Sequence, residues 1–172
     1  MEYFTKEEMI RCYRERKQDR CSECRLQQAV KRMPDGIDEN MEALVDNVLD
    51  PCRRAYGKPI GVNSGFRCPL HNSRVGGASQ SQHIAGEAAD IRCHTDSTDN
   101  TDELLWLAQI IVQNGRFDQM TLYPTFIHVS YKRTGINRHR ILKKETSSSK
   151  YIVLETSSFL HHTSSIPKGG AS

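Results

Sequence analysis

The hydrophobic positions between residues 38 and 56 recur at the three- and four-residue spacing of a helix. Gly57 follows the last of them, and a left-handed glycine commonly ends a helix. Pro51 lies inside the pattern and predicts a kink or a break there. The pattern therefore predicts the strongest helix of the chain over residues 38–56. Its apolar residues are Met41, Leu44, Val45, Val48, Leu49, Cys52 and Ala55.

Two more segments carry helix signals at their ends. Thr5 and Glu8 stand at the spacing of a capping box, which predicts a short first helix. Asn100 and Glu103 repeat that spacing before an apolar face, and Gly115 ends the pattern. That face consists of Leu104, Leu105, Leu107, Ala108, Ile111 and Val112.

Short segments of β type lie between and after these helices. The strand over residues 87–92 would place Asp90 on a sheet. Mixed helices and strands of this kind predict an α+β fold, with a small antiparallel sheet and flanking helices. The remaining predicted elements are a polar helix over 22–32, strands over 60–62, 119–123 and 126–131, and an edge strand over 139–143.

The chain changes character near residue 145. Clusters of serine and threonine alternate there with short apolar patches and show no core periodicity. We expect a flexible tail, or a loosely docked strand at residues 151–154. The predicted organisation is an N-terminal helical extension over 1–37, a main domain over 38–144 and a Ser/Thr-rich tail over 145–172.

Composition limits the class of protein without defining it. With 172 residues, 37% hydrophobic and 26% charged, the chain suits an ordinary globular domain with a sizeable core. A net charge of +3 does not indicate nucleic acid as a partner. The chain contains no run of eighteen apolar residues, so no membrane span is predicted. The first residues lack the basic-then-apolar pattern of a signal peptide, so we expect synthesis in the cytoplasm.

Six cysteines raise the question of disulfides or metal. Without a signal peptide, reduced thiols are the expectation. Cys21 and Cys24 form a CxxC motif with Cys12 nearby, but one pair alone does not specify a structural zinc site. The polar surroundings of this pair do not favour a redox motif either.

Residues 81–90 carry the candidate chemistry. His83 and Asp90 flank a segment of small residues with Gly86 near its middle, and His128 stands in a β-type alternation. Imidazole nitrogen and carboxylate oxygen are ligands of catalytic zinc, and three protein ligands leave a fourth position for water. Together these residues predict an open zinc site across a sheet face. The alternative for each residue alone is a hydrogen-bonded histidine or a turn-capping aspartate.

The residues around this segment fit a site as well. Arg67 follows Ser64-Gly65-Phe66, and an arginine held there can grip a carboxylate or polarise a carbonyl. His71 and His94 lie among polar residues, so we expect them to face solvent or substrate. The pair His161-His162 lies in the Ser/Thr-rich tail and is expected to be part of a flexible segment.

Four segments of the chain carry a family resemblance: residues 64–67, 72–77, 81–90 and 126–130. Together they resemble the family of zinc D-Ala-D-Ala carboxypeptidases and L-alanyl-D-glutamate endopeptidases. That family cleaves the peptide stems of bacterial peptidoglycan and includes phage endolysins. The resemblance implies that His83, Asp90 and His128 are zinc ligands. It also implies that Arg67 stabilises the scissile carbonyl or its oxyanion, and that Ser81 contacts substrate. The resemblance covers about residues 38–143.

The general base departs from the pattern of that family. The family places Glu or Asp three residues before the second zinc histidine, where this chain has Thr125. A threonine hydroxyl does not accept a proton at neutral pH. Asp118 and Glu87 are the candidate replacements, and the alternative for Asp118 is a strand-start or turn residue after Gly115. Because zinc itself lowers the pKa of its water to about 7, a missing base would slow catalysis without abolishing it.

The sequence therefore predicts a zinc metallopeptidase that acts on peptidoglycan stem peptides as a carboxypeptidase or an endopeptidase. A protein without its own signal would reach the cell wall after release, as a phage endolysin does. We expect a monomer with no nucleic-acid partner. The alternative is a catalytically degenerate, zinc-containing module that binds the cell wall, and Thr125 keeps this alternative open.

Overall fold

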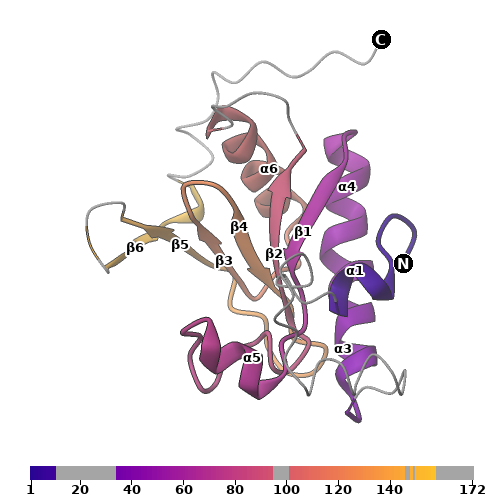
Figure 1. Cartoon of the computed structure of the whole chain (residues 1–172). Coiled ribbons are helices and arrows are strands. Elements are labelled where there is room, and N and C mark those ends of the chain that lie inside the picture. Colours follow the sequence, from indigo (N-terminus) through magenta and orange to yellow (C-terminus); the bar gives the residue numbers. More distant parts are fainter. Residues whose placement is uncertain (11–33, 95–100, 146–147, 149, 158–172) are drawn as a thin grey trace.

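The computed structural model describes residues 1–10, 34–94, 101–145, 148 and 150–157. Several features expected from the sequence lie outside the described residues: the helix over 22–32, the group Cys12, Cys21 and Cys24, the cap at Asn100, and the pair His161-His162. The described part forms an α+β fold, as predicted, with a sheet of six strands (Figure 1). Across the described residues, no helix is both long enough and apolar enough to cross a membrane.

The sheet is antiparallel at every strand pair except one. Its order is β1-β2-β4-β3-β5-β6, and only β3 and β5 run parallel. The predicted strands are confirmed within one or two residues at their ends. The bounds are β1 Ile60–Ser64, β2 Ala88–Cys93, β3 Gln119–Leu122, β4 Ile127–Ser130, β5 Arg140–Lys144 and β6 Tyr151–Leu154.

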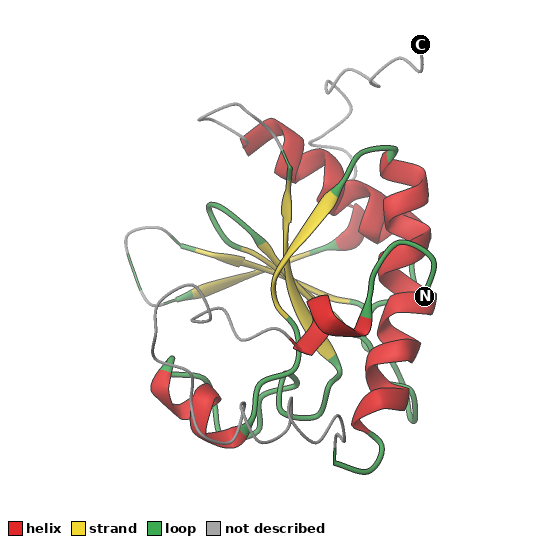
Figure 2. Ribbon diagram, turned by 45° about the vertical axis from the view of Figure 1, so that its right-hand side comes forward, coloured by secondary structure: helices red, strands yellow, loops and turns green. Residues whose placement is uncertain are grey.

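The longer helices form one layer against the sheet. Figure 2 shows them on one side of the strands, with α5 apart from them. The bounds are α1 Lys6–Ile10, α3 Ile37–Leu44, the π-helix η2 Val45–Leu49, α4 Asp50–Tyr56, α5 Pro69–Arg74 and α6 Thr101–Asn114. The capping box of α1 is confirmed, because the Glu8 amide donates to Thr5 Oγ1 and the Thr5 amide donates to Glu8 Oε2.

Of the kink or break expected at Pro51, the break does not occur. Helical structure continues from residue 37 to residue 56, and the irregularity is the π-helical turn η2 immediately before the proline. In this turn the Asp50 amide donates to the Val45 carbonyl, five residues back. A proline lacks an amide hydrogen and its ring crowds the carbonyl four residues earlier. The wider π turn accommodates both constraints, so the helix runs on to Gly57, where φ is 73°.

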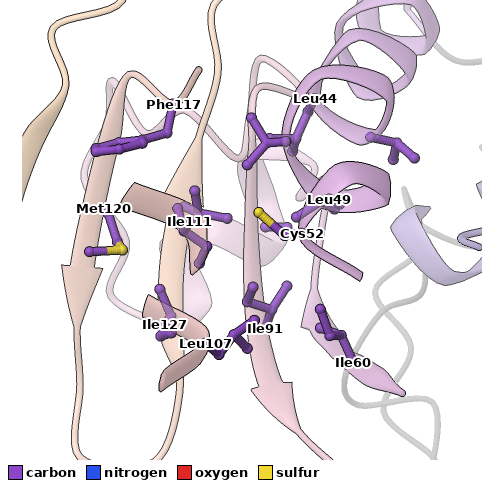
Figure 3. Close-up of a cluster of buried hydrophobic side chains, with 14 of the residues drawn as sticks. Leu44, Leu49, Cys52, Ile60, Ile91, Leu107, Ile111, Phe117, Met120 and Ile127 are labelled. Carbon is purple, nitrogen blue, oxygen red and sulfur yellow. The ribbon is translucent and has the colours of Figure 1, made fainter. Parts of the chain in front are cut away.

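The hydrophobic core fills the space between the helical layer and one face of the sheet (Figure 3). Ile91 on β2 and Ile127 on β4 are paired in the ladder and fully buried on this face. Leu107 and Ile111 of α6 face them from the helical layer. Because side chains alternate along a strand, the residues between these core positions point to the opposite face of the sheet.

The described part of the N-terminal extension belongs to the same core. Met9 on α1 is completely buried, and Phe4 before it is 4% exposed. The Phe66 amide donates to the Met9 carbonyl at 2.7 Å, which fixes α1 beside the end of β1. The segment before residue 11 is therefore packed with the main domain.

The strand predicted as the sheet edge is an inner strand. Residues of β5 pair with β3 on one side and with β6 on the other, so the expectation of an edge strand over 139–143 is wrong. Of the two alternatives for residues 151–154, the structure shows the docked strand. That strand, β6, now occupies this edge of the sheet.

Candidate metal centre

Three side chains that the sequence singled out meet on the face of the sheet opposite the core. The structure brings together His83, Asp90 and His128. His83 Nε2 lies 3.1 Å from Asp90 Oδ1 and 3.2 Å from His128 Nδ1. His128 Nδ1 lies 2.9 Å from the same Asp90 oxygen. Three electron-rich atoms thus converge on one point.

The sheet register positions two of these residues. Asp90 on β2 lies directly opposite His128 on β4 in the antiparallel ladder. Opposed residues of a ladder point to the same face, with their Cβ atoms about 4.5–5.5 Å apart. The neighbours Ala89 and Ile91 point into the core and are completely buried, which locks this orientation.

A turn before β2 delivers the third residue. In this turn the Gly86 amide donates to the His83 carbonyl at 3.3 Å. Gly86 has φ +70°, and a Cβ there would lie 2.9 Å from the Ile37 carbonyl oxygen. Only glycine suits both constraints. Asn40 on α3 donates to the Ala85 carbonyl at 2.9 Å and ties the turn to the helical layer.

The other nitrogen of His83 is held by the backbone. His83 Nδ1 lies 2.7 Å from the Gly65 carbonyl oxygen, which can only accept a hydrogen bond. Nδ1 therefore carries the proton, and Nε2 presents its lone pair to Asp90 and His128. Burial lowers the pKa of His83, whose residue exposure is 2%, and so favours the neutral imidazole that a metal requires.

Asp90 is held as a carboxylate. Burial opposes its ionisation, but the neighbouring imidazoles of His128 and His83 outweigh burial and keep the pKa of Asp90 below its usual range. Its second oxygen, Oδ2, accepts from the Arg67 guanidinium. Two imidazole nitrogens and one carboxylate oxygen form a donor set that fits zinc. The side chain of His128, 16% exposed, is the most accessible of the three, so the site is open on that side.

Arg67 lies beside the metal ligands. One of its terminal nitrogens donates to Asp90 Oδ2, and its Nε donates to Ser64 Oγ at 2.7 Å. A guanidinium has five N–H donors, so these two bonds leave others to act on a bound molecule. The structure thus places Arg67 where it orients Asp90, and its predicted role toward a scissile carbonyl stays a prediction.

Ser81 supports the turn that carries His83. Its hydroxyl oxygen accepts from the His83 amide at 3.4 Å, and its carbonyl accepts from the Ile84 amide at 2.9 Å. Ser81 is partly exposed, so its hydroxyl is accessible near the site. Its predicted contact with substrate stays a prediction.

Asp118 is engaged by an arginine. Its carboxylate accepts from Arg138 Nε at 2.9 Å and from an Arg138 terminal nitrogen at 2.5 Å, and from Gln82 Nε2 at 3.0 Å. The side chain is completely buried at the start of β3, three residues before the position that pairs with His128. At a rise of about 3.3 Å per residue, this offset is roughly 10 Å along the strand. The arrangement favours the structural alternative for Asp118, and its catalytic role stays a prediction.

The other positions considered for a general base lie outside the ligand group. Glu87 is partly buried just before β2, and burial raises its pKa. Thr125 is exposed in the turn between β3 and β4. Among the described residues, the group able to hold a metal consists of His83, Asp90 and His128, and no further carboxylate joins it.

The two histidines near the motif behave differently. His94 is exposed, as expected. His71 is only 4% exposed, so of its two expected positions the one facing solvent is wrong, and the one facing substrate stays a prediction. The helix α5 begins at Pro69 and turns His71 and Asn72 toward the interior. A polar neighbourhood in sequence did not reveal this burial, because a short helix presents only some of its residues to solvent.

Sequence reasoning missed the groups that hold the ligands in place. Ser64 orients Arg67, and the Gly65 carbonyl orients His83. Both residues stand in the segment that drew attention for Arg67. The direction of a serine hydroxyl or a backbone carbonyl depends on the local fold, so the sequence offered only their proximity as a signal.

A buried imidazole–carboxylate–imidazole set with one accessible side is typical of the metal centre of a hydrolase. Comparison with known families agrees with this class. The profile of the Peptidase M15 family matches residues 2–130, which include all three ligand residues and three quarters of the chain. The chain belongs to the Peptidase M15 family, and the resemblance expected from the sequence is confirmed.

One curated relative matches over a short segment. It is a zinc D-Ala-D-Ala carboxypeptidase from Streptomyces albus G, 57% identical over 44 residues. The match covers 25% of this chain and 17% of that enzyme. The chain therefore spans well under two thirds of the length of that relative. The name of the relative states the metal and the bond on which that enzyme acts.

Proposed function

We propose that this protein is a zinc-dependent peptidase that hydrolyses the peptide stems of bacterial peptidoglycan. Membership of the Peptidase M15 family supports a peptidase, and the matching relative is named for zinc and for a D-Ala-D-Ala bond. The observation that carries the proposal is the convergence of His83, Asp90 and His128 within 3.2 Å of one another on an accessible sheet face.

The chain's own residues have separate tasks in this reaction. His83, Asp90 and His128 would hold the metal, which when bound would supply Lewis-acid activation of a water and of the amide carbonyl. The Gly65 carbonyl fixes the tautomer of His83, and Arg67 keeps Asp90 turned toward the two histidines. The remaining donors of Arg67 act on the substrate, as an oxyanion or carboxylate partner.

Proton transfer requires a group beyond the three metal ligands. A general base must come within hydrogen-bond reach of the attacking water. Asp118 and Glu87 are the candidates, and Thr125 cannot serve at neutral pH. Because no further carboxylate of the described residues joins the ligand group, the alternative of a degenerate zinc module that binds the cell wall without cutting it stays open.

The finer activity is proposed on the same basis. The enzyme acts as a monomer at the bacterial cell wall, as a D-Ala-D-Ala carboxypeptidase or as a stem endopeptidase of the phage endolysin type. The name of the relative favours the carboxypeptidase. A D,D and an L,D cut leave different peptide fragments, so the bond can be identified from the products.

The test is digestion of purified peptidoglycan followed by mass spectrometry of the soluble fragments. We expect stems shortened at one defined bond, with the reaction lost in His128→Ala and in chelated wild-type protein, and restored by added zinc. Wild-type protein that binds the cell wall, retains zinc and releases no fragment would establish the binding module instead.

A further inference from the structure

We propose that Tyr151, on the edge strand β6, contacts the part of the substrate peptide that lies away from the cleaved bond. This contact would make the enzyme favour long substrates over short ones. The inference rests on the proposed peptidase function. It adds to the reaction a residue that lies outside the segment matched by the family, which ends at residue 130.

One row of residues runs across the sheet from the metal centre to β6. Asp90 pairs with His128, and His128 pairs with Thr121 of β3. Thr121 pairs with Leu142 of β5, which pairs with Val153 of β6. Laterally paired residues share a face, so this row lies on the face that carries the metal ligands.

Tyr151 lies on that face as well. It stands two residues before Val153, and side chains two apart on a strand point to the same side. Tyr123 stands two residues after Thr121 and follows the same rule. The two tyrosine hydroxyls are 3.1 Å apart, which shows that both side chains emerge together above the sheet.

The tyrosines belong to an ordered aromatic cluster. The Tyr123 ring stacks on Phe126 with centroids 4.3 Å apart, and it meets Tyr151 edge-on at 6.4 Å. Lys144 places its ammonium 4.5 Å from the centre of the Tyr151 ring. Burial raises the pKa of Tyr123, and the hydrogen bond to Tyr151 and the charge of Asp90 add to the rise. Tyr123 and Tyr151 thus belong to one cluster on the face that carries the metal ligands.

The β6 end of this row is apolar and exposed, whereas Thr121 and Leu142 within the row are buried. Tyr151 is 49% exposed and Val153 is 57% exposed. Figure 1 shows β6 at the end of the sheet away from α3 and α4. An exposed aromatic and aliphatic surface on the sheet face that carries the metal ligands is suited to bind substrate.

The position of β6 defines which part of a substrate it can meet. It is three strands from β4, which at about 4.8 Å per strand is roughly 14 Å from the strand of His128. An extended peptide covers roughly 3.4 Å per residue, so this distance corresponds to about four residues. The occupant is therefore an extended peptide whose scissile bond is at the metal centre and whose distal residues cross the Tyr123–Tyr151 pair.

The experiment compares substrates of two lengths in four proteins. The substrates are a blocked dipeptide with only the cleaved bond and a peptide extended by four stem residues. The proteins are the wild type, Tyr151→Ala, Tyr151→Phe and the control Ile152→Ala. Ile152 is 44% exposed on the same strand, but it points to the opposite face.

We expect Tyr151→Ala to raise KM for the long peptide about tenfold, the effect of losing one aromatic contact, with kcat unchanged. KM for the dipeptide should not change, Tyr151→Phe should keep the wild-type KM, and Ile152→Ala should match the wild type. An unchanged KM for the long peptide in Tyr151→Ala, or an equal rise for both substrates, would overturn the inference. Zinc content and melting temperature confirm that each variant is folded.

A failure of the proposed function has a different signature. In that case the wild type cleaves neither peptide. Equilibrium binding of the long peptide then still tests the inference, because Tyr151→Ala should weaken binding about tenfold relative to both wild type and Ile152→Ala. Equal affinity of all three proteins would overturn it.

Discussion

The Nδ1 atom of His83 lies 2.7 Å from the carbonyl oxygen of Gly65, so the orientation of a metal ligand depends on the backbone at the end of β1. A Cβ at Gly65 would lie 2.1 Å from the Met9 carbonyl oxygen. The helix α1, the strand β1 and the metal centre are therefore coupled at a single glycine.

Gly65→Ala should lower both the melting temperature and the zinc affinity. The new methyl group must push α1 away or move the Gly65 carbonyl, and loss of such a support to a metal-bound histidine typically reduces affinity about 10- to 100-fold. Competition with a zinc chelator measures this. Gly61→Ala is the control on the same strand, because its Cβ would meet only the flexible Arg92 side chain, at 3.1 Å. Equal zinc affinity in Gly65→Ala and wild type would contradict the coupling.

His83→Ala and His128→Ala should each abolish stoichiometric zinc binding. Each change removes one of three ligands, and the zinc-dependent part of the stability disappears with it by mass action. Elemental analysis of dialysed protein gives the metal content, and thermal melts with and without chelator give the stability. His94→Ala, an exposed histidine outside the ligand group, is the control. Full zinc content in both ligand variants would refute the assignment.

Arg67→Ala should reduce turnover by about 10²- to 10³-fold while zinc remains bound at saturating metal, because a donor to developing negative charge is lost. Ser64→Ala should produce a smaller loss, on the order of tenfold, since it removes only the hydroxyl that steers Arg67. Arg92→Ala, at an exposed position of β2, should behave as wild type. Full turnover in Arg67→Ala would show that this residue supports the fold alone.

Asp118→Asn and Arg138→Gln separate the two roles of Asp118. If the ion pair is structural, both variants lose about 1.5–3 kcal/mol of unfolding free energy, the usual contribution of a hydrogen bond to a charged group, and both keep turnover per zinc-loaded molecule. If Asp118 shuttles the proton, turnover falls about 100-fold or more in Asp118→Asn and persists in Arg138→Gln. The geometry favours the first outcome. Glu87→Gln, assayed in parallel, tests the other carboxylate.

The stability contributed by Asp118 should depend on pH. Burial alone would raise its pKa, but the hydrogen bonds from Arg138 outweigh burial and hold the pKa of Asp118 below its ordinary value. A carboxylate of this kind contributes stability that is fully present above the unfolded pKa of about 3.9 and is lost as the pH falls through the lower folded value. The difference in unfolding free energy between wild type and Asp118→Asn should therefore be constant near neutrality and shrink below about pH 4. Denaturant titrations at several pH values measure it, and a difference that grows on acidification would contradict the prediction.

The face of the sheet that holds the metal could be predicted because a strand alternates with a period of two. Small and apolar residues on either side of Asp90 and His128 left one orientation for each. The order of the strands could not be predicted in the same way. The sequence pattern predicts that β5 is a strand. Its pairing with β3 and β6 depends on contacts between residues that are far apart in the sequence.

Other features depend on geometry that residue identity does not encode. Proline usually ends a helix, yet the π turn before Pro51 relieves its crowding, and the bond from Asp50 to Val45 is visible only in the backbone. Arg138 lies 20 residues from Asp118 in a segment without periodicity, so nothing in the pattern connected them. The alternation of β6 was equally hidden, because Tyr151, Ile152 and Val153 are all exposed.

The pairing of Asp90 with His128 makes the metal centre a reporter of strand alignment. If β2 slipped by one residue against β4, Asp90 would exchange faces with Ala89, and a carboxylate would enter the core beside Ile127. A molecule with this misaligned strand pair would lose both its bound metal and its stability. The ratio of bound zinc to protein in a refolded preparation therefore measures the fraction of molecules whose central strands are correctly aligned, without any assay of activity.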